Sequence, residues 1–107
     1  MLVRTHIKNL TEPEKDQFEA YLPKKLEALT AILEAHYPDE DTVKLDVHIQ
    51  RHEKHTAFEV DYILHLPRTH QPLVGSEVKH SVTEPMDKAI AKLESQVVKH
   101  FKKLTHE

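Results

Sequence analysis

The sequence contains no cysteine and only one glycine among its 107 residues. Without cysteine the chain has no disulfide, no thiolate ligand for a metal and no cysteine nucleophile. One glycine is too few for the glycine-rich loops that cradle phosphates. Long apolar runs are missing as well, since no four hydrophobic residues are consecutive. We therefore expect a cytoplasmic protein that carries no secretion signal and does not span a membrane.

Charge is distributed unevenly along the chain. The hydrophobic (38%) and charged (31%) fractions fit a polar-surfaced globular protein, and we expect one domain spanning residues 1–107. The net charge is −3, and ten histidines would move it toward positive values near pH 6. Glu12–Glu40 holds eight acids against three bases, whereas Lys88–Lys103 holds five bases against one acid. Any nucleic-acid binding must therefore use a local cationic surface.

Residues 83–104 are expected to form an amphipathic helix that presents such a surface. Thr83 is the expected N-cap, and Pro85 suits the first turn. Six apolar residues recur at spacings of three or four and should face the core: Met86, Ile90, Leu93, Val97, Phe101 and Leu104. Five lysines lie opposite them with no acid interleaved: Lys88, Lys92, Lys99, Lys102 and Lys103. A row of one sign suggests a polyanion partner, although an ordinary solvated helix face remains an alternative.

Another helix is expected near the N-terminus, after a short strand at residues 2–7. Thr11 and Glu14 have the spacing of a capping box, so this helix should begin there. It should end before Tyr37, and Pro23 should kink it.

Three strands are expected between the helices. Apolar and polar residues alternate through 43–50 and 58–66, and the polar stretch Arg51–His55 reads as the tip of a hairpin. A last strand lies around Gly75 and is marked by Val74, Val78 and Val82. The order β-α-β-β-β-α predicts an α+β fold, with both helices packed on one face of a four-stranded sheet and a polar face left open.

Several short stretches occur in the order and spacing of a known family. They are Lys8-Asn9 followed by YLPKKLEAL at 21–29, HTAFEV at 55–60 closing on LHLP at 64–67, and KLESQVVKH at 92–100. Together they resemble the ribosome hibernation promoting factors, which are ribosome-associated inhibitors also known as sigma-factor modulation proteins. The chain departs from the family pattern at Pro23, and it resembles the short form because it stops soon after the last helix.

The resemblance implies a non-enzymatic factor with a fold like that of double-stranded-RNA-binding domains. Such a factor binds the small ribosomal subunit in the channel for messenger and transfer RNA, without cofactor, metal or small-molecule substrate. Ribosomal RNA would then lie on the lysine row, because lysines can follow phosphates without reading sequence. Further contacts are expected from the hairpin tip and the first helix, through Arg51, His52, Lys54, His55, Lys24 and Lys25. The oligomeric state is left open.

Candidate residues for metal binding and for hydrolysis are present, but their positions do not favour either function. His48, His52 and His55 are close in sequence, but a strand residue and two turn residues do not converge as tetrahedral zinc requires. His80 and Ser81 are adjacent and should point to opposite faces of a strand, so they cannot form a nucleophile–base pair.

A protein-binding module is the main alternative. The polar sheet face is expected to show four acids among few bases, and the first helix is acidic. A basic protein could dock on that face, which would carry Asp46, Glu59, Asp61 and Glu77.

Overall fold

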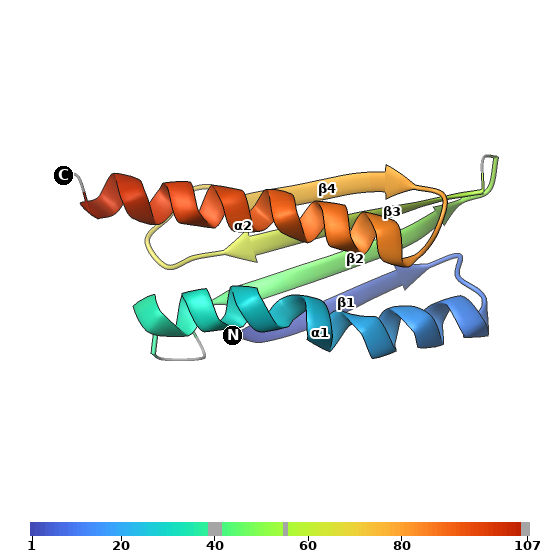
Figure 1. Ribbon diagram of the computed structural model, residues 1–107, viewed down its shortest axis with the longest axis horizontal. Helices are drawn as coiled ribbons and strands as arrows, with labels where there is room; N and C mark the ends of the chain where they lie inside the picture. The colour runs from blue at the N-terminus through green and yellow to red at the C-terminus, as the bar shows by residue number, and fades with distance from the viewer. Residues whose placement is uncertain (39–41, 55, 106–107) are drawn as a thin grey trace.

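The structure is a computed structural model that describes residues 1–38, 42–54 and 56–105. Its elements, shown in Figure 1, are β1 (Leu2–Lys8), α1 (Glu12–His36), β2 (Lys44–His52), β3 (Ala57–His65), β4 (Leu73–Lys79) and α2 (Thr83–Thr105). The predicted β-α-β-β-β-α order is confirmed.

The four strands form one mixed sheet in the order β1-β2-β3-β4. β1 runs parallel to β2, whereas the β2–β3 and β3–β4 pairs are antiparallel. Figure 1 shows both helices on the same side of this sheet, with α1 along β1 and β2 and α2 along β3 and β4. The predicted α+β fold is therefore confirmed, and the face of the sheet away from the helices is called the open face below.

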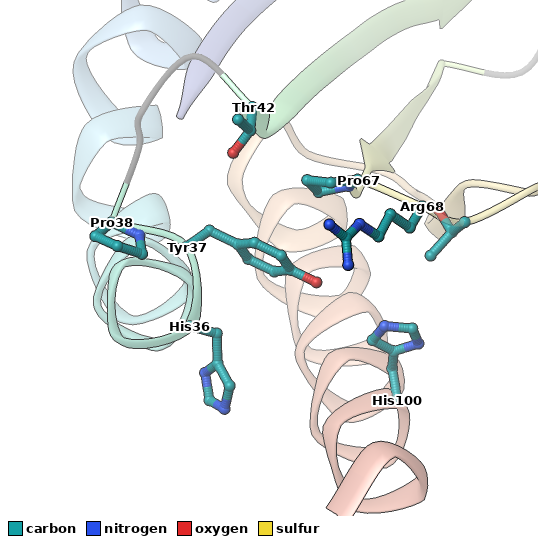
Figure 2. Close-up of a pocket in the computed structure, with 8 residues that line it drawn as sticks. His36, Tyr37, Pro38, Thr42, Pro67, Arg68 and His100 are labelled. Atoms are coloured by element: carbon teal, nitrogen blue, oxygen red, sulfur yellow. The ribbon is translucent and has the colours of Figure 1, made fainter.

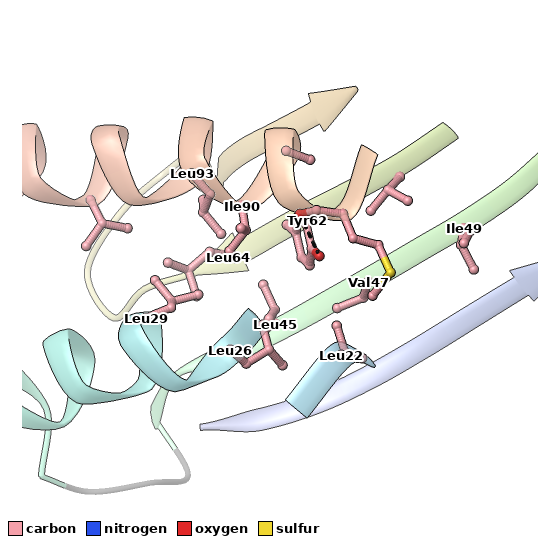
Figure 3. Packing of buried hydrophobic residues seen from close by; sticks show 14 of the residues in the cluster. Leu22, Leu26, Leu29, Leu45, Val47, Ile49, Tyr62, Leu64, Ile90 and Leu93 are labelled. Carbon is pink, nitrogen blue, oxygen red and sulfur yellow. Dashed lines mark hydrogen bonds between the residues drawn. The ribbon is translucent and has the colours of Figure 1, made fainter. Parts of the chain in front are cut away.

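The core lies between the sheet and the helices (Figure 3). Alternate side chains of β2 and β3 enter it and are almost fully buried, namely Leu45, Val47, Ile49, Val60, Tyr62 and Leu64. Each large apolar side chain buried in this way contributes roughly 1.5–3 kcal/mol. The Tyr62 hydroxyl donates a hydrogen bond to the Met86 carbonyl oxygen at 3.2 Å, and burial raises the pKa of this phenol.

The predicted limits of α1 are confirmed. The Thr11 backbone N–H donates to the Glu14 carboxylate at 2.8 Å, and the Glu14 N–H donates to the Thr11 hydroxyl at 3.3 Å, which completes the capping box. The helix runs through Pro23 as one element, and Tyr37 caps its C-terminal end.

The first turn of α2 differs from the prediction. Thr83 already lies in the helix, and the Ser81 hydroxyl accepts the Glu84 N–H at 3.4 Å in place of the expected Thr83 cap. The predicted apolar stripe is buried from Met86 to Phe101. The side chain of Leu104 lies outside the described residues.

The buried and exposed faces of β4 are reversed relative to the prediction. Glu77, expected on the polar face of the sheet, faces the helices together with Gly75, whereas Val74 and Val78 are exposed on the open face. The cause is the closeness of α2, because a Cβ on Gly75 would press on the Ala89 carbonyl oxygen and lie 2.9 Å from the Leu93 nitrogen. No side chain fits beneath the helix at this position.

The β2–β3 hairpin is also longer than predicted. β2 continues through His52, so Arg51 and His52 belong to a strand and not to the turn. Neighbouring strand residues point to opposite faces, and the two bases therefore separate. His55 lies outside the described residues.

Candidate nucleic-acid interface

The outward side of α2 carries the lysines expected from the sequence. Lys88, Lys99, Lys102 and Lys103 are exposed. Within the described parts of the chain, Lys88, Lys99 and Lys103 have no carboxylate oxygen within 4 Å. These three side chains place exposed ammonium groups, unpaired with any described carboxylate, along the length of the helix, where they could contact phosphates.

Lys92 behaves differently from the rest of the row. Its ammonium group lies 2.9 Å from the Glu77 carboxylate and donates to the Ser76 carbonyl oxygen at 3.1 Å. The hydrogen bond from Lys92, with a second one from the Val78 backbone N–H, lowers the pKa of Glu77. The expectation of a row without neighbouring carboxylates is therefore wrong at Lys92. Helix periodicity excluded acids on the same helix, but it carried no information about the side of β4 that meets the row.

Side chains also cover the outer edge of β4. The Gln96 side chain accepts from the Val74 N–H at 3.3 Å and donates to the Val74 carbonyl oxygen, one turn of helix beyond Lys92. The Glu77 carboxylate accepts the Val78 N–H at 3.2 Å. Side chains thus occupy backbone groups that an edge strand otherwise offers to another chain.

Lys25 does not extend the cationic surface as predicted. Its ammonium group lies 2.7 Å from the Asp87 carboxylate, and the Tyr21 hydroxyl donates to the same oxygen at 2.8 Å. Burial alone would raise the pKa of Asp87, but the hydrogen bonds from Lys25 and Tyr21 lower it below its usual value. Lys25 therefore joins α1 to α2, whereas its neighbour Lys24 is exposed and has no ion pair with a described residue.

The bases of the hairpin do not converge on one site. The Arg51 guanidinium reaches toward Glu14 of α1 at 3.9 Å, and the His52 imidazole contacts Glu59 of β3 at 2.9 Å. Only Lys54, in the turn, is both exposed and without an ion pair to a described residue. The described bases of the hairpin therefore do not gather into one cationic patch, which the predicted second RNA contact would require.

The open face is not the acidic surface expected for a protein-binding module. Glu77 lies on the helix side, and Asp46 is enclosed by one arginine and two histidines. The Asp46 carboxylate contacts Arg4 at 3.1 Å, His65 at 3.2 Å and His6 at 3.4 Å. Burial alone would raise the pKa of Asp46, but the contacts with His6, Arg4 and His65 outweigh it and lower this pKa below its usual value.

A pocket of about 510 Å³ lies where the C-terminal ends of both helices meet the loop between β3 and β4 (Figure 2). Its described lining includes Tyr37, Arg68, His36 and His100, and no acid. Arg68 is exposed and has a φ of 64°, an uncommon conformation for a residue with a side chain. Sequence reasoning missed Arg68, because a single arginine between strands gives no periodic signal.

The described residues offer no cluster for a metal ion and no helix that could cross a membrane. Among them, no three histidine, aspartate or glutamate side chains are placed to hold a metal ion. Neither α1 nor α2 combines the length and apolar character needed to cross a bilayer.

Comparison with known proteins places the chain in a family. The sequence profile of the sigma 54 modulation protein / S30EA ribosomal protein family matches residues 5–105. Among solved structures, the chain is similar to the N-terminal domain of Thermus thermophilus Protein Y, with 24% identity and a TM-score of 0.61 over 91% of this chain and 96% of that one. No curated protein sequence matches significantly. Because the profile covers nearly the whole chain, this protein belongs to the sigma 54 modulation protein / S30EA ribosomal protein family, as the sequence resemblance to the hibernation factors predicted.

Proposed function

We propose that this protein is a ribosome hibernation factor, which binds the small ribosomal subunit in the cytoplasm and holds ribosomes inactive without catalysing a reaction. Membership of the family over residues 5–105 is the observation that carries the proposal. The chain would act as a single ribosome-binding domain.

The contact with ribosomal RNA is assigned to the outward side of α2. Lys88, Lys99 and Lys103 form the primary contact because they are exposed and have no carboxylate within 4 Å among the described residues. From Lys88 to Lys103 the helix rises about 22 Å, at 1.5 Å per residue, which is enough to meet several phosphates. Lys102 adds a further cation on the same side.

Lys92 and Arg68 modify this surface. Lys92 must leave Glu77 before it can bind a phosphate, so its contribution is smaller than that of Lys99. Arg68 shares a pocket with His100 of α2 and so extends the cationic surface beyond the helix. Lys24 and Lys54 remain single peripheral contacts in this proposal.

The experiment is co-sedimentation of the purified protein with small and large ribosomal subunits at neutral pH. The test variant is K99Q/K103Q. The matched control is K15Q/K44Q, which removes the same charge from a lysine of α1 and from a lysine of β2 that points to the open face. We expect the wild-type protein and the control to sediment with small subunits, and the test variant to stay largely in the supernatant.

Two outcomes would contradict parts of the proposal. Preferential binding to large subunits, or to neither, contradicts the hibernation function. Equal losses in the test variant and the control contradict the assignment to α2, because they would show that total charge alone sets the affinity.

A further inference from the structure

Histidines gather on the open face of the sheet. By strand register His6 of β1 lies opposite His48 of β2, and His65 of β3 lies opposite Lys44. His52 of β2 points to the same face and contacts Glu59. The rings of His6 and His48 stack with their centroids 4.3 Å apart. Four of the ten histidines therefore share one surface.

The other charged groups on this face balance one another. The bases are Arg4 and Lys8 of β1 with Lys44 of β2, and the acids are Asp46 of β2 with Glu59 and Asp61 of β3. From β4 the face receives only uncharged side chains, those of Val74, Ser76 and Val78. Both helices lie on the opposite side of the sheet. With neutral imidazoles, the formal charge of the open face is therefore zero.

Acidification changes this balance. Imidazole side chains generally gain a proton as the pH falls through about 6.5, while carboxylates stay ionised until much lower pH. Four protonated imidazoles would give the face a surplus of up to four positive charges. Two of its three acids are already engaged, Asp46 by Arg4, His6 and His65, and Glu59 by His52.

We propose that the open face is a second RNA-binding surface, which gains affinity for RNA as its histidines are protonated and is separate from the lysines of α2. RNA fits this surface better than an acidic protein does. The cations can contact phosphates, and the flat, stacked rings of His6 and His48 provide an aromatic platform for bases on the same sheet. An acidic protein would use the charges alone.

The test measures the affinity for a fluorescent single-stranded RNA of about 20 nucleotides at about pH 7.5 and about pH 5.8. The face variant is H6Q/H48Q, which removes the stacked pair of rings. The matched control is H70Q/H80Q, which removes two exposed histidines outside the strands and so changes the titratable charge equally. Acidification should raise the affinity of the wild-type protein and of the control about tenfold, and that of the face variant by much less.

NMR of the wild-type protein keeps the proposal testable even if the face variant does not fold. At acid pH, added RNA should shift the imidazole signals of His6, His48 and His65 more than those of His70 and His80. The opposite pattern would overturn the proposal.

Two further results would also overturn it. One is an equal gain on acidification in the face variant and in the control. The other is binding of poly-glutamate as tightly as RNA at acid pH, which would identify an acidic-protein surface instead. The K99Q/K103Q variant separates the two surfaces, because it should weaken RNA binding at both pH values and keep the gain on acidification.

Discussion

Asp87 on α2 holds two side chains of α1 at once. Its carboxylate accepts the Tyr21 hydroxyl and pairs with the Lys25 ammonium. The pKa of Asp87 is lowered, so its contribution to stability is present above the unfolded-state pKa and is lost as the pH falls through the folded-state pKa. The helix–helix contact is thus strongest at neutral pH.

The D87N substitution tests this contact. We expect it to lower the free energy of unfolding by about 1 kcal/mol at neutral pH, a modest value because the carboxylate is partly exposed. The difference from the wild-type protein should shrink as the pH falls from about 4 toward about 2. Denaturant unfolding at several pH values measures it, with D16N as the control at an exposed aspartate of α1 that has no described ion pair. A difference independent of pH would contradict the ionic origin.

Glu77 limits the cationic surface at a single residue. Its carboxylate binds the Lys92 ammonium at 2.9 Å, so removing its charge should free that lysine for a phosphate. We expect E77Q to raise the affinity for small ribosomal subunits and to steepen its salt dependence by at most about 0.8. Subunit binding at several salt concentrations measures both quantities. A lower affinity would show that the ion pair itself holds α2 in its binding position.

Gly75 sets the distance between two elements of the fold, α2 and β4. A methyl group there would press on the Ala89 carbonyl oxygen, and backbone on both sides leaves little room to adjust. We expect G75A to cost about 3 kcal/mol of unfolding free energy. The control is S76A, on the neighbouring residue whose side chain points to the open face. Equal stability of the two variants, measured by denaturant unfolding, would show that the helix can move away at little cost.

The elements differ in how far the sequence predicted them. The start of α1 followed from the capping box at Thr11 and Glu14, and the presence of β2 and β3 followed from alternation, because these signals are local. β4 was read with the wrong side buried. Glu77 was expected on the polar face, whereas the packing distance of α2, which no local pattern encodes, requires Gly75, and with it Glu77, on the helix side.

Local sequence patterns also predict the candidate site only in part. Which lysines share a side of α2 follows from helical periodicity. The partners of Lys92 and Lys25 do not, because Glu77 and Asp87 come from other elements. The open-face histidines were visible only as a compositional excess until the strand register brought His6, His48 and His65 together.

At the scale of the whole molecule, the charged surfaces are separated by the sheet. The lysines of α2 lie on the helix side, near the edge strand β4, and the histidines lie on the open face. The net charge of −3 for the whole chain indicates neither the lysine surface nor the histidine surface. This separation gives a protein with an acidic balance a cationic surface at a defined place.

The salt dependence of binding to small ribosomal subunits shows whether the outward lysines of α2 contact phosphates. Each lost phosphate contact flattens the plot of log affinity against log salt by roughly 0.7 to 0.9. We expect K99Q/K103Q to flatten the slope by roughly 1.5 relative to the wild-type protein and K15Q/K44Q to leave it unchanged. An unchanged slope in K99Q/K103Q would contradict the claim that the outward lysines of α2 hold the RNA.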